Sequence, residues 1–287
     1  MRELTVTEST RDQTTRVADR PSSPATAEGP PRAMLRMDSV SHSFITPTGQ
    51  RMEVLSDVSI SVEENEFFTV VGPSGCGKTT LLNIAVGLVE PAGGTVRHVT
   101  GASGGRPGAV GYITQDSNLL PWATVMENVM VPLEIRKVKR SERREQAAEW
   151  IRIVGLGGFE DHYPRQLSGG MQKRCAIART MVYDPEIVFM DEPFGALDAL
   201  TKTTMQKILL DLWQTRRKTI IFITHDLTEA IALSDRVGVM TGRPGTLKAV
   251  VPVPLGRPRD VYRITGAPGF ESLRNELWSL LETDLDP

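Results

Sequence analysis

The stretch Gly72-Pro73-Ser74-Gly75-Cys76-Gly77-Lys78-Thr79-Thr80 decides the fold of this chain. It fits the pattern G-x-x-x-x-G-K-[ST], which describes a loop whose backbone N–H groups bind phosphate. An apolar run at 67–71 precedes it, and a helix-like run at 79–86 follows it. The pattern requires this order of strand, loop and helix, because the phosphates bind at the N-terminus of the helix. The sequence therefore predicts an α/β fold with a phosphate site at 72–80.

The residue types in this loop suit a nucleotide. Its glycines let the backbone turn sharply and approach an anion without Cβ clashes. Lys78 can reach the β- and γ-phosphates as a point charge, the Thr79 hydroxyl can bind Mg²⁺, and Thr80 can donate on the α-phosphate side. The alternative is a plain glycine-rich turn, which the flanking strand and helix disfavour.

The bulk composition sets limits on the class of protein. The 287 residues are enough for one large domain or two lobes, and the net charge of −2 gives no reason to expect nucleic-acid binding. No apolar run has the length of a membrane span, and the N-terminus lacks a signal-peptide pattern, so we expect a membrane role only through a partner. Cys76 and Cys175 are expected to be reduced thiols of a cytosolic protein. Because Cys76 lies in the phosphate loop, bulky thiol reagents are expected to inhibit.

The segments before and after the loop are less specific. Residues 1–33 contain few large apolar side chains, which predicts a disordered tail. Two strands are expected at 34–44 and 52–62, and Phe44 at the end of the first suits either stacking on adenine or a place in the core. The glycine-rich runs at 93–94 and 101–108 are expected to be loops.

Polar side chains follow three further predicted strands. Gln115 follows the run at 109–114, Asp191 and Glu192 end the run that starts at 187, and His225 follows the run at 219–224. Ligands of open α/β sheets bind at the carboxyl ends of the strands. Gln115 is placed to meet Mg²⁺ or water, Asp191 to hold the Mg²⁺ shell, Glu192 to polarise water and His225 to contact the γ-phosphate. The alternatives are a helix cap or surface charge pair for the carboxylates and a structural role for the histidine.

A helical insertion is expected at about 116–182, with helices at 124–131, 142–154 and 171–182. Within it, Ser168-Gly169-Gly170 precedes a helix and predicts a second anion-binding helix N-terminus. The chain thus has two half-sites for phosphate, which can meet within one chain or between two chains. Further on, Asp198 leads into a helix that extends to about residue 215, strands are expected at 219–224 and 236–240, and 270–281 predicts a short amphipathic helix for packing.

Together these motifs resemble the ATP-binding cassette (ABC) ATPases over about residues 34–250. The order and spacing of the phosphate loop, Gln115, Leu167-Ser168-Gly169-Gly170, Asp191-Glu192, Asp198 and His225 carry the resemblance. It implies an ABC nucleotide-binding domain of the P-loop NTPase class, with a RecA-like core, an antiparallel β subdomain and a helical subdomain. It divides the chain into a tail at 1–33, the ATPase domain at 34–250 and a C-terminal extension at 251–287.

The resemblance also implies a role for each matching position, with ATP and Mg²⁺ as cofactors. Glu192 is expected to be the general base, with His225 and Gln115 also catalytic. Thr79, Gln115 and Asp191 are expected to hold Mg²⁺. The expected nucleotide contacts are Phe44, Gly72, Pro73, Ser74, Gly75, Cys76, Gly77, Lys78, Thr79, Thr80, Ser168, Gly170 and Asp198. Ser168 and Gly170 are expected to bind ATP held by a second cassette, with Asp198 at the seam. The family signature is the stretch 167–170 at the start of a helix, here called the signature helix. In this chain Met171 follows it, where many members have Gln.

The branch is indicated by Leu119-Leu120-Pro121-Trp122-Ala123-Thr124-Val125, Arg243-Pro244-Gly245 and Pro258-Arg259-Asp260, which look like the nitrate/sulfonate/taurine importers. The implied partners are a second ATPase subunit, a membrane permease, and indirectly an extracytoplasmic solute-binding protein, but no nucleic acid. Leu120, Pro121 and Trp122 are candidates for the surface that meets the permease, and the alternative is that they pack inside the helical lobe. The implied place is the cytoplasmic face of the membrane. An exporter ATPase and a soluble, non-transport ABC ATPase are the alternatives.

Overall fold

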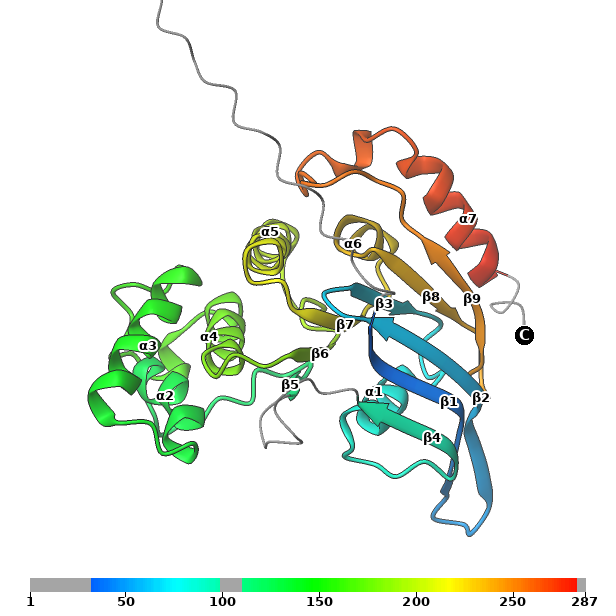
Figure 1. The fold of residues 1–287 in the computed structure, drawn as a ribbon, viewed down its shortest axis with the longest axis horizontal. Coiled ribbons are helices and arrows are strands. Elements are labelled where there is room, and N and C mark those ends of the chain that lie inside the picture. The colour runs from blue at the N-terminus through cyan, green and yellow to red at the C-terminus, as the bar shows by residue number, and fades with distance from the viewer. Residues whose placement is uncertain (1–31, 99–109, 283–287) are drawn as a thin grey trace, which may run out of the picture. The chain divides into compact units, whose positions relative to one another are not determined.

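The computed structural model describes residues 32–98 and 110–282. Its larger sheet has the order β5-β6-β7-β3-β8-β9, in which every neighbouring pair is parallel except β8 and β9 (Figure 1). The strands are β3 (Phe67–Val71), β5 (Val110–Ile113), β6 (Ile187–Asp191), β7 (Thr219–Ile223), β8 (Arg236–Met240) and β9 (Leu247–Pro252). β3, β6 and β7 are buried along their whole length, as their apolar sequences predict.

A second sheet of three antiparallel strands has the order β2-β1-β4. β1 (Ala33–Ile45) and β2 (Arg51–Glu63) confirm the two strands expected before the phosphate loop. The prediction of a loop at 93–94 is wrong, because Gly93–His98 forms β4 and pairs with β1. Gly94 has φ +82°, and a Cβ there would lie 2.3 Å from the Ser39 carbonyl oxygen. The glycine therefore permits a close approach of two strands.

The helices are α1 (Lys78–Val86), α2 (Val125–Ile135), α3 (Arg140–Ile153), α4 (Gly169–Met181), α5 (Ala199–Arg216), α6 (Leu227–Leu233) and α7 (Phe270–Glu282). α2, α3 and α4 pack on one another to one side of the larger sheet (Figure 1). These are the three helices expected in 116–182. α6 and β9 are not predicted by the sequence, since α6 has seven residues and β9 has no alternating apolar pattern.

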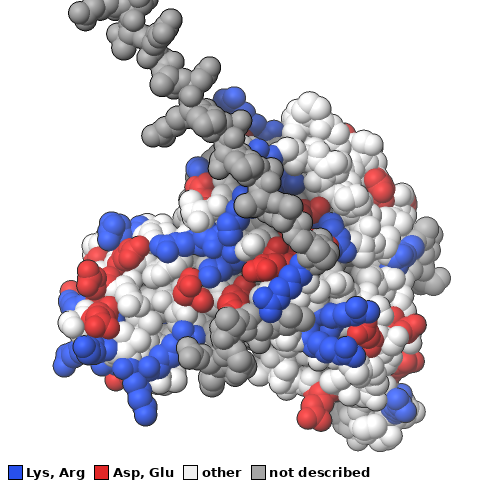
Figure 2. Space-filling view, in the orientation of Figure 1, with Lys and Arg blue, Asp and Glu red and all other residues white. Residues whose placement is uncertain are grey.

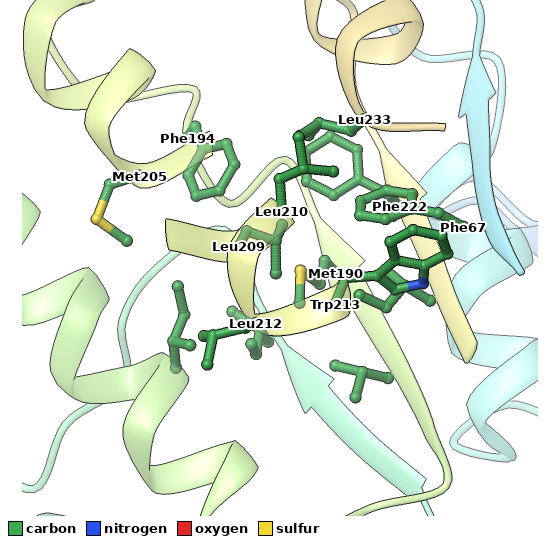
Figure 3. Close-up of a cluster of buried hydrophobic side chains, with 14 of the residues drawn as sticks. Phe67, Met190, Phe194, Met205, Leu209, Leu210, Leu212, Trp213, Phe222 and Leu233 are labelled. Atoms are coloured by element: carbon green, nitrogen blue, oxygen red, sulfur yellow. The ribbon is translucent and has the colours of Figure 1, made fainter. Parts of the chain in front are cut away.

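The main apolar cluster lies between the larger sheet and the helices around it. Phe67, Met190 and Phe222 from the sheet meet Leu209 and Trp213 of α5 (Figure 3). A second cluster joins the other face of this sheet to α1 and the antiparallel strands. Since α1 packs in this cluster, the phosphate loop before it is held between the two sheets.

The residues after β8 pack on the same sheet. β9 spans residue 250, the expected domain boundary, and α7 packs against α6, β8 and β9. Phe270, Leu273 and Leu277 are buried, which confirms the expectation that this helix packs. Arg259 is also buried and donates to the carbonyls of Ile231, Ala232, Ser234, Val253 and Leu255.

Two expectations lie outside the described residues: the tail, for residues 1–31, and the loop at 101–108. Among the described helices, none is both long and apolar enough to span a membrane. On the face shown in Figure 2, Lys and Arg side chains are interspersed with Asp and Glu, including over the helices α2 to α4. The described part of that face thus has no extended patch of positive charge alone or of negative charge alone.

Candidate nucleotide site

One pocket collects most of the predicted site residues. It lies at the carboxyl ends of β3 and β6 and has a volume of about 440 Å³. Strands two positions apart in the sheet thus deliver their terminal side chains to one place. The lining residues are Phe44, Met52, Val54, Ser74, Gly75, Gly77, Lys78, Thr79, Thr80, Gln115, Asp191, Glu192 and Arg243.

The phosphate loop is built to bind an anion. α1 begins at Lys78 with no side-chain cap on its first N–H groups, which leaves these donors for a ligand. Gly77 precedes the helix with φ +101°, and a Cβ there would lie 2.9 Å from Leu55 and Val54 side-chain carbons, so only glycine fits. Lys78 is 6% exposed, and its Nζ donates to the Gly72 and Pro73 carbonyls at 2.9 Å each. These bonds hold the ammonium group at the pocket.

Thr79 and Asp191 come together in the pocket, as predicted. Burial raises the pKa of the Asp191 carboxyl, while a hydrogen bond from the Thr79 side chain opposes this rise. A hydroxyl and a carboxylate are the hard oxygen donors that Mg²⁺ prefers, with water and phosphate oxygens completing its shell. No cluster of three His, Cys, Asp or Glu side chains suited to a metal occurs in 32–98 or 110–282. These residues therefore fit a Mg²⁺ ion that is brought with a nucleotide, rather than one bound by protein alone.

Glu192 and His225 form a pair beside this group. The Glu192 Oε2 and His225 Nδ1 atoms lie 3.1 Å apart. Glu192 has φ +40°, in the left-handed region that an L residue with a long side chain rarely adopts, and its N–H donates to the Ile223 carbonyl. Such backbone strain is often found at functional sites. It turns Glu192 away from the strand direction, so that its side chain lines the same pocket as Asp191.

The aromatic end of the pocket comes from the antiparallel sheet. Phe44 is 42% exposed and lines the pocket, which excludes the alternative of a core aromatic. It pairs across the strands with Met52, which lines the pocket too. An exposed ring beside the phosphate loop gives a flat apolar surface on which a base can stack.

The second predicted half-site lies apart from this pocket. Ser168 is exposed and caps α4, since its Oγ accepts from the Met171 N–H at 3.3 Å. A Cβ on Gly170 would lie 2.5 Å from the Thr201 Cγ2, so a glycine is needed where α4 meets α5. Asp198 caps α5 by accepting from the Thr201 N–H at 3.0 Å. The structure therefore brings Gly170 and Asp198 to the same helix junction, and neither they nor Ser168 line the pocket.

Comparisons with known proteins show the family of the chain. The family model described as ABC transporter matches residues 55–195. An uncharacterised ABC transporter ATP-binding protein of Methanocaldococcus jannaschii is 53% identical over 238 residues, which is 83% of this chain and 87% of the relative. The chain belongs to the ABC transporter family. It is an ATP-binding subunit and an ATPase of that family, with the P-loop NTPase fold.

Two further relatives are informative about this ABC ATPase. The taurine import ATP-binding protein TauB of Pelagibacter ubique is 42% identical over 242 residues, or 83% of this chain and 91% of the relative. A solved ATP-binding cassette, in a dimeric post-hydrolysis state bound to ADP and phosphate, superposes with a TM-score of 0.67 at 30% identity. That comparison covers 77% of this chain and 99% of the solved one.

Lys173 on α4 is a residue of this ABC ATPase that no sequence motif marks as functional. It is 4% exposed, and its Nζ donates to the Thr114 carbonyl at 3.0 Å and the Gln115 carbonyl at 2.7 Å. Burial lowers its pKa to about 8. Lys173 therefore ties the signature helix to the backbone of Gln115, whose side chain is exposed at the pocket. A lysine in a helix gives no such signal in the sequence, because most lysines are solvated.

The expectation for Cys76 needs correction. Its backbone belongs to the phosphate loop, but its side chain is 1% exposed and packs in the second apolar cluster. Burial raises the pKa of its thiol. Because the thiolate is the reactive form, ready inhibition by bulky thiol reagents is not expected in the folded protein. The thiol does not line the pocket.

The segment after Gln115 divides into buried and exposed parts. Leu119 packs against the main apolar cluster, whereas the Trp122 side chain is 73% exposed. Of the three candidates for the permease surface, Leu120 is half-buried, whereas Pro121 and Trp122 are exposed. Asn128 is buried and holds the backbone of this stretch in place. Its side chain accepts a hydrogen bond from the Leu120 N–H and donates to the carbonyls of Leu120, Ala123 and Thr124.

Proposed function

We propose that this ABC ATPase supplies the energy for an importer that takes up a small anion of the sulfonate type through a separate membrane permease. The ATPase part rests on one observation, the convergence of Lys78, Thr79, Asp191 and Glu192 in a single pocket. The importer part is supported by the taurine import relative at 42% identity. Taurine is an amino sulfonate, which suggests the class of solute.

The residues of the pocket divide the work of ATP hydrolysis. Lys78 and the free N–H groups of α1 bind and neutralise the phosphates, and Thr79, Asp191 and Gln115 would hold Mg²⁺. When bound, Mg²⁺ supplies charge neutralisation at the phosphate oxygens. Glu192 orients the attacking water and accepts its proton, and His225, whose Nδ1 lies 3.1 Å from the Glu192 Oε2, positions that carboxylate and would contact the γ-phosphate.

We infer that the full site is shared between two chains. Ser168 and Gly170 do not line the pocket of their own chain, yet α4 presents its N-terminus with Ser168 exposed. In a homodimer, this helix end in one chain would face the γ-phosphate held by the other, with Asp198 at the seam. The dimeric form of the solved cassette supports this arrangement.

We infer that Trp122 contacts the permease. A tryptophan exposed to 73% is an unusual surface residue, and such rings are enriched at the centres of interfaces. Trp122 follows Gln115 by seven residues, so a movement of Gln115 at the Mg²⁺ site would displace the backbone that carries Trp122. The chain would then lie at the cytoplasmic face of the membrane, held there by the permease, with a solute-binding protein acting on the other side.

The test is a pull-down of the tagged chain from its native membranes, followed by mass spectrometry. We expect a multi-span permease and a solute-binding protein to co-purify. Trp122→Glu should lose the permease while keeping its affinity for ATP. Trp278→Glu is the matched control, because Trp278 is also exposed but lies on α7.

Other outcomes would redirect the proposal. Recovery of ribosomal proteins or DNA in place of a permease would retain the ATPase and contradict the transport role. Recovery of a permease without a solute-binding protein, with solute moving outward in vesicles, would favour an exporter. Uptake of labelled taurine or another sulfonate by the purified complex tests the class of solute.

A further inference from the structure

We propose that Arg243 recognises the nucleoside part of a nucleotide bound in the pocket. The inference rests on the proposed nucleotide site and adds a residue to it. Arg243 lies in the turn after β8 and lines the same pocket as the phosphate loop.

The side chain of Arg243 spans the phosphate loop and the antiparallel hairpin. Its Nε and Nη2 atoms donate to the Gly75 carbonyl at 3.3 and 3.0 Å. Its Nη1 lies 3.2 Å from the Met52 Sδ. The guanidinium group is therefore held where the loop meets the strand that pairs with Phe44.

The turn that carries Arg243 is fixed in place. The Gly245 N–H donates to the Val54 carbonyl at 2.8 Å, and the Ser56 N–H donates to the Gly245 carbonyl at 3.0 Å. A Cβ on Gly245 would lie only 2.1 Å from the Cys76 carbonyl oxygen, so the turn packs directly on the phosphate loop. The position of the guanidinium group is thus set before a ligand binds, which favours a precise contact.

Arg243 keeps unused binding capacity. A guanidinium group has five N–H donors, and the three contacts above use one on each nitrogen. In the described ranges 32–98 and 110–282, no carboxylate lies within ion-pair distance of it. A cation with free donors and no acidic partner at the wall of a pocket suits a ligand with oxygen acceptors or an aromatic face.

The sheet order indicates which part of the nucleotide this is. β3 leads into the phosphate loop, and β6, which ends in Asp191, lies two strands away on one side of it. β8, which leads to Arg243, is the neighbour of β3 on the other side. The Mg²⁺ and water-activating residues therefore flank one side of the loop, while Arg243 flanks the other with Phe44 and Met52. Phosphates bound in the loop would extend toward the first group, so the ribose and base would lie with the second.

The decisive experiment compares two ligands that share phosphates and differ in the nucleoside. Calorimetry measures the dissociation constants of ADP and of inorganic tripolyphosphate for the parent protein and for Arg243→Ala. We expect the variant to bind ADP about tenfold more weakly, the loss of one charged hydrogen bond. Its affinity for tripolyphosphate should fall only about twofold at physiological salt, because that ligand has no ribose or base and loses only a screened long-range attraction.

Two further variants sharpen the result. Arg243→Lys keeps the positive charge but loses the planar group, and should lose part of the ADP affinity. Arg263→Ala makes the same change of charge at a side chain that is 89% exposed, and should leave both affinities unchanged. Thermal unfolding of each variant checks that the fold is retained.

The outcomes separate the possible errors. Equal losses for ADP and tripolyphosphate would mean that Arg243 only braces the phosphate loop, and would overturn the inference. Unchanged ADP affinity in Arg243→Ala would overturn it too. If the parent protein bound neither ligand, the proposed site itself would be wrong, and the inference would fail with it.

Discussion

The two regions that we propose bind phosphate, the phosphate loop and the start of α4, are built in opposite ways. In the phosphate loop, Lys78 is buried and bonded to two carbonyls of its own loop, and Thr79 bonds to Asp191. At the start of α4, Ser168 is exposed and lies outside the pocket. The first region is assembled within one chain before ATP binds, whereas the second has a helix end and a cap but no opposite wall. Under the proposed dimer, the single chain would therefore suffice to bind ATP, whereas turnover would require a second chain.

The largest expected effect separates binding from chemistry within the first region. Glu192→Gln should lower kcat for ATP by about 100-fold or more, because the amide cannot accept the proton of the attacking water. ATP affinity should stay within about twofold, since Lys78 and the loop are unchanged. Phosphate release and calorimetry measure the two quantities.

The control for this variant is Asp184→Asn, which changes a carboxylate whose side chain is 73% exposed and forms an ion pair with Lys218. It should hydrolyse ATP at the parent rate. Hydrolysis by Glu192→Gln at a rate within fivefold of the parent rate would contradict the role of Glu192 as general base. The proposed catalytic role of the first region would then lack its main residue.

The second prediction concerns a variant that disrupts the region at the start of α4. Ser168→Arg places a bulky cation at the exposed N-terminus of α4, where it opposes both a facing chain and the positive end of the helix. The single chain should bind ATP with unchanged affinity, while the dimer induced by ATP is lost and ATPase activity falls at least about tenfold. Light scattering with and without ATP measures the dimer. Weakened ATP binding by the isolated variant would show that the two regions are not independent.

Regions with strong local patterns were predictable from the sequence. The phosphate loop has fixed glycines, a lysine and a threonine, and the buried strands β3, β6 and β7 are continuous apolar runs, so their order placed Asp191 and His225 at strand ends. The expected α/β fold is confirmed by the comparisons and by the two sheets. β4 was missed because its glycine pair signals a turn, although Gly94 serves a close strand approach.

Features that depend on tertiary contacts were not predictable. The contact of Arg243 with Gly75 joins residues 168 positions apart, and that of Lys173 with Gln115 joins residues 58 positions apart. Neither cation has a local pattern that distinguishes it from a solvated one. The direction of the Cys76 side chain was not predictable either, because the loop pattern specifies the path of the backbone but not the side to which the thiol points.

The third prediction tests how closed the phosphate loop is. Both Cys76 and Cys175 are buried, and burial raises the pKa of each thiol, to about 12 for Cys175. Maleimide should therefore label the native protein at least about tenfold more slowly than the unfolded protein, in which both thiols react. ATP should add little protection, since the thiol already faces the apolar cluster. Rapid labelling of native Cys76 that ATP blocks would show that the loop opens widely without a nucleotide.

The smallest expected effect concerns the link between the two regions. Lys173 lies on the signature helix and bonds to the backbone of Gln115 beside the pocket, and burial lowers its pKa from 10.5 to about 8. Between these two values the unfolded chain binds more protons than the folded chain, so the free energy of unfolding should rise as the pH rises from 8 to 10. The slope from this group is at most about 1.4 kcal/mol per pH unit.

Lys173→Met removes the titrating group while keeping much of its apolar length. The difference in unfolding free energy between the parent and this variant should change in favour of the parent as the pH rises from 8 to 10, measured by urea unfolding at each pH. The comparison cancels the other groups that titrate in this range. A difference that is constant with pH would mean that Lys173 keeps an ordinary pKa and reaches solvent. The link between α4 and Gln115 would then be loose, and the two regions would move independently even within one chain.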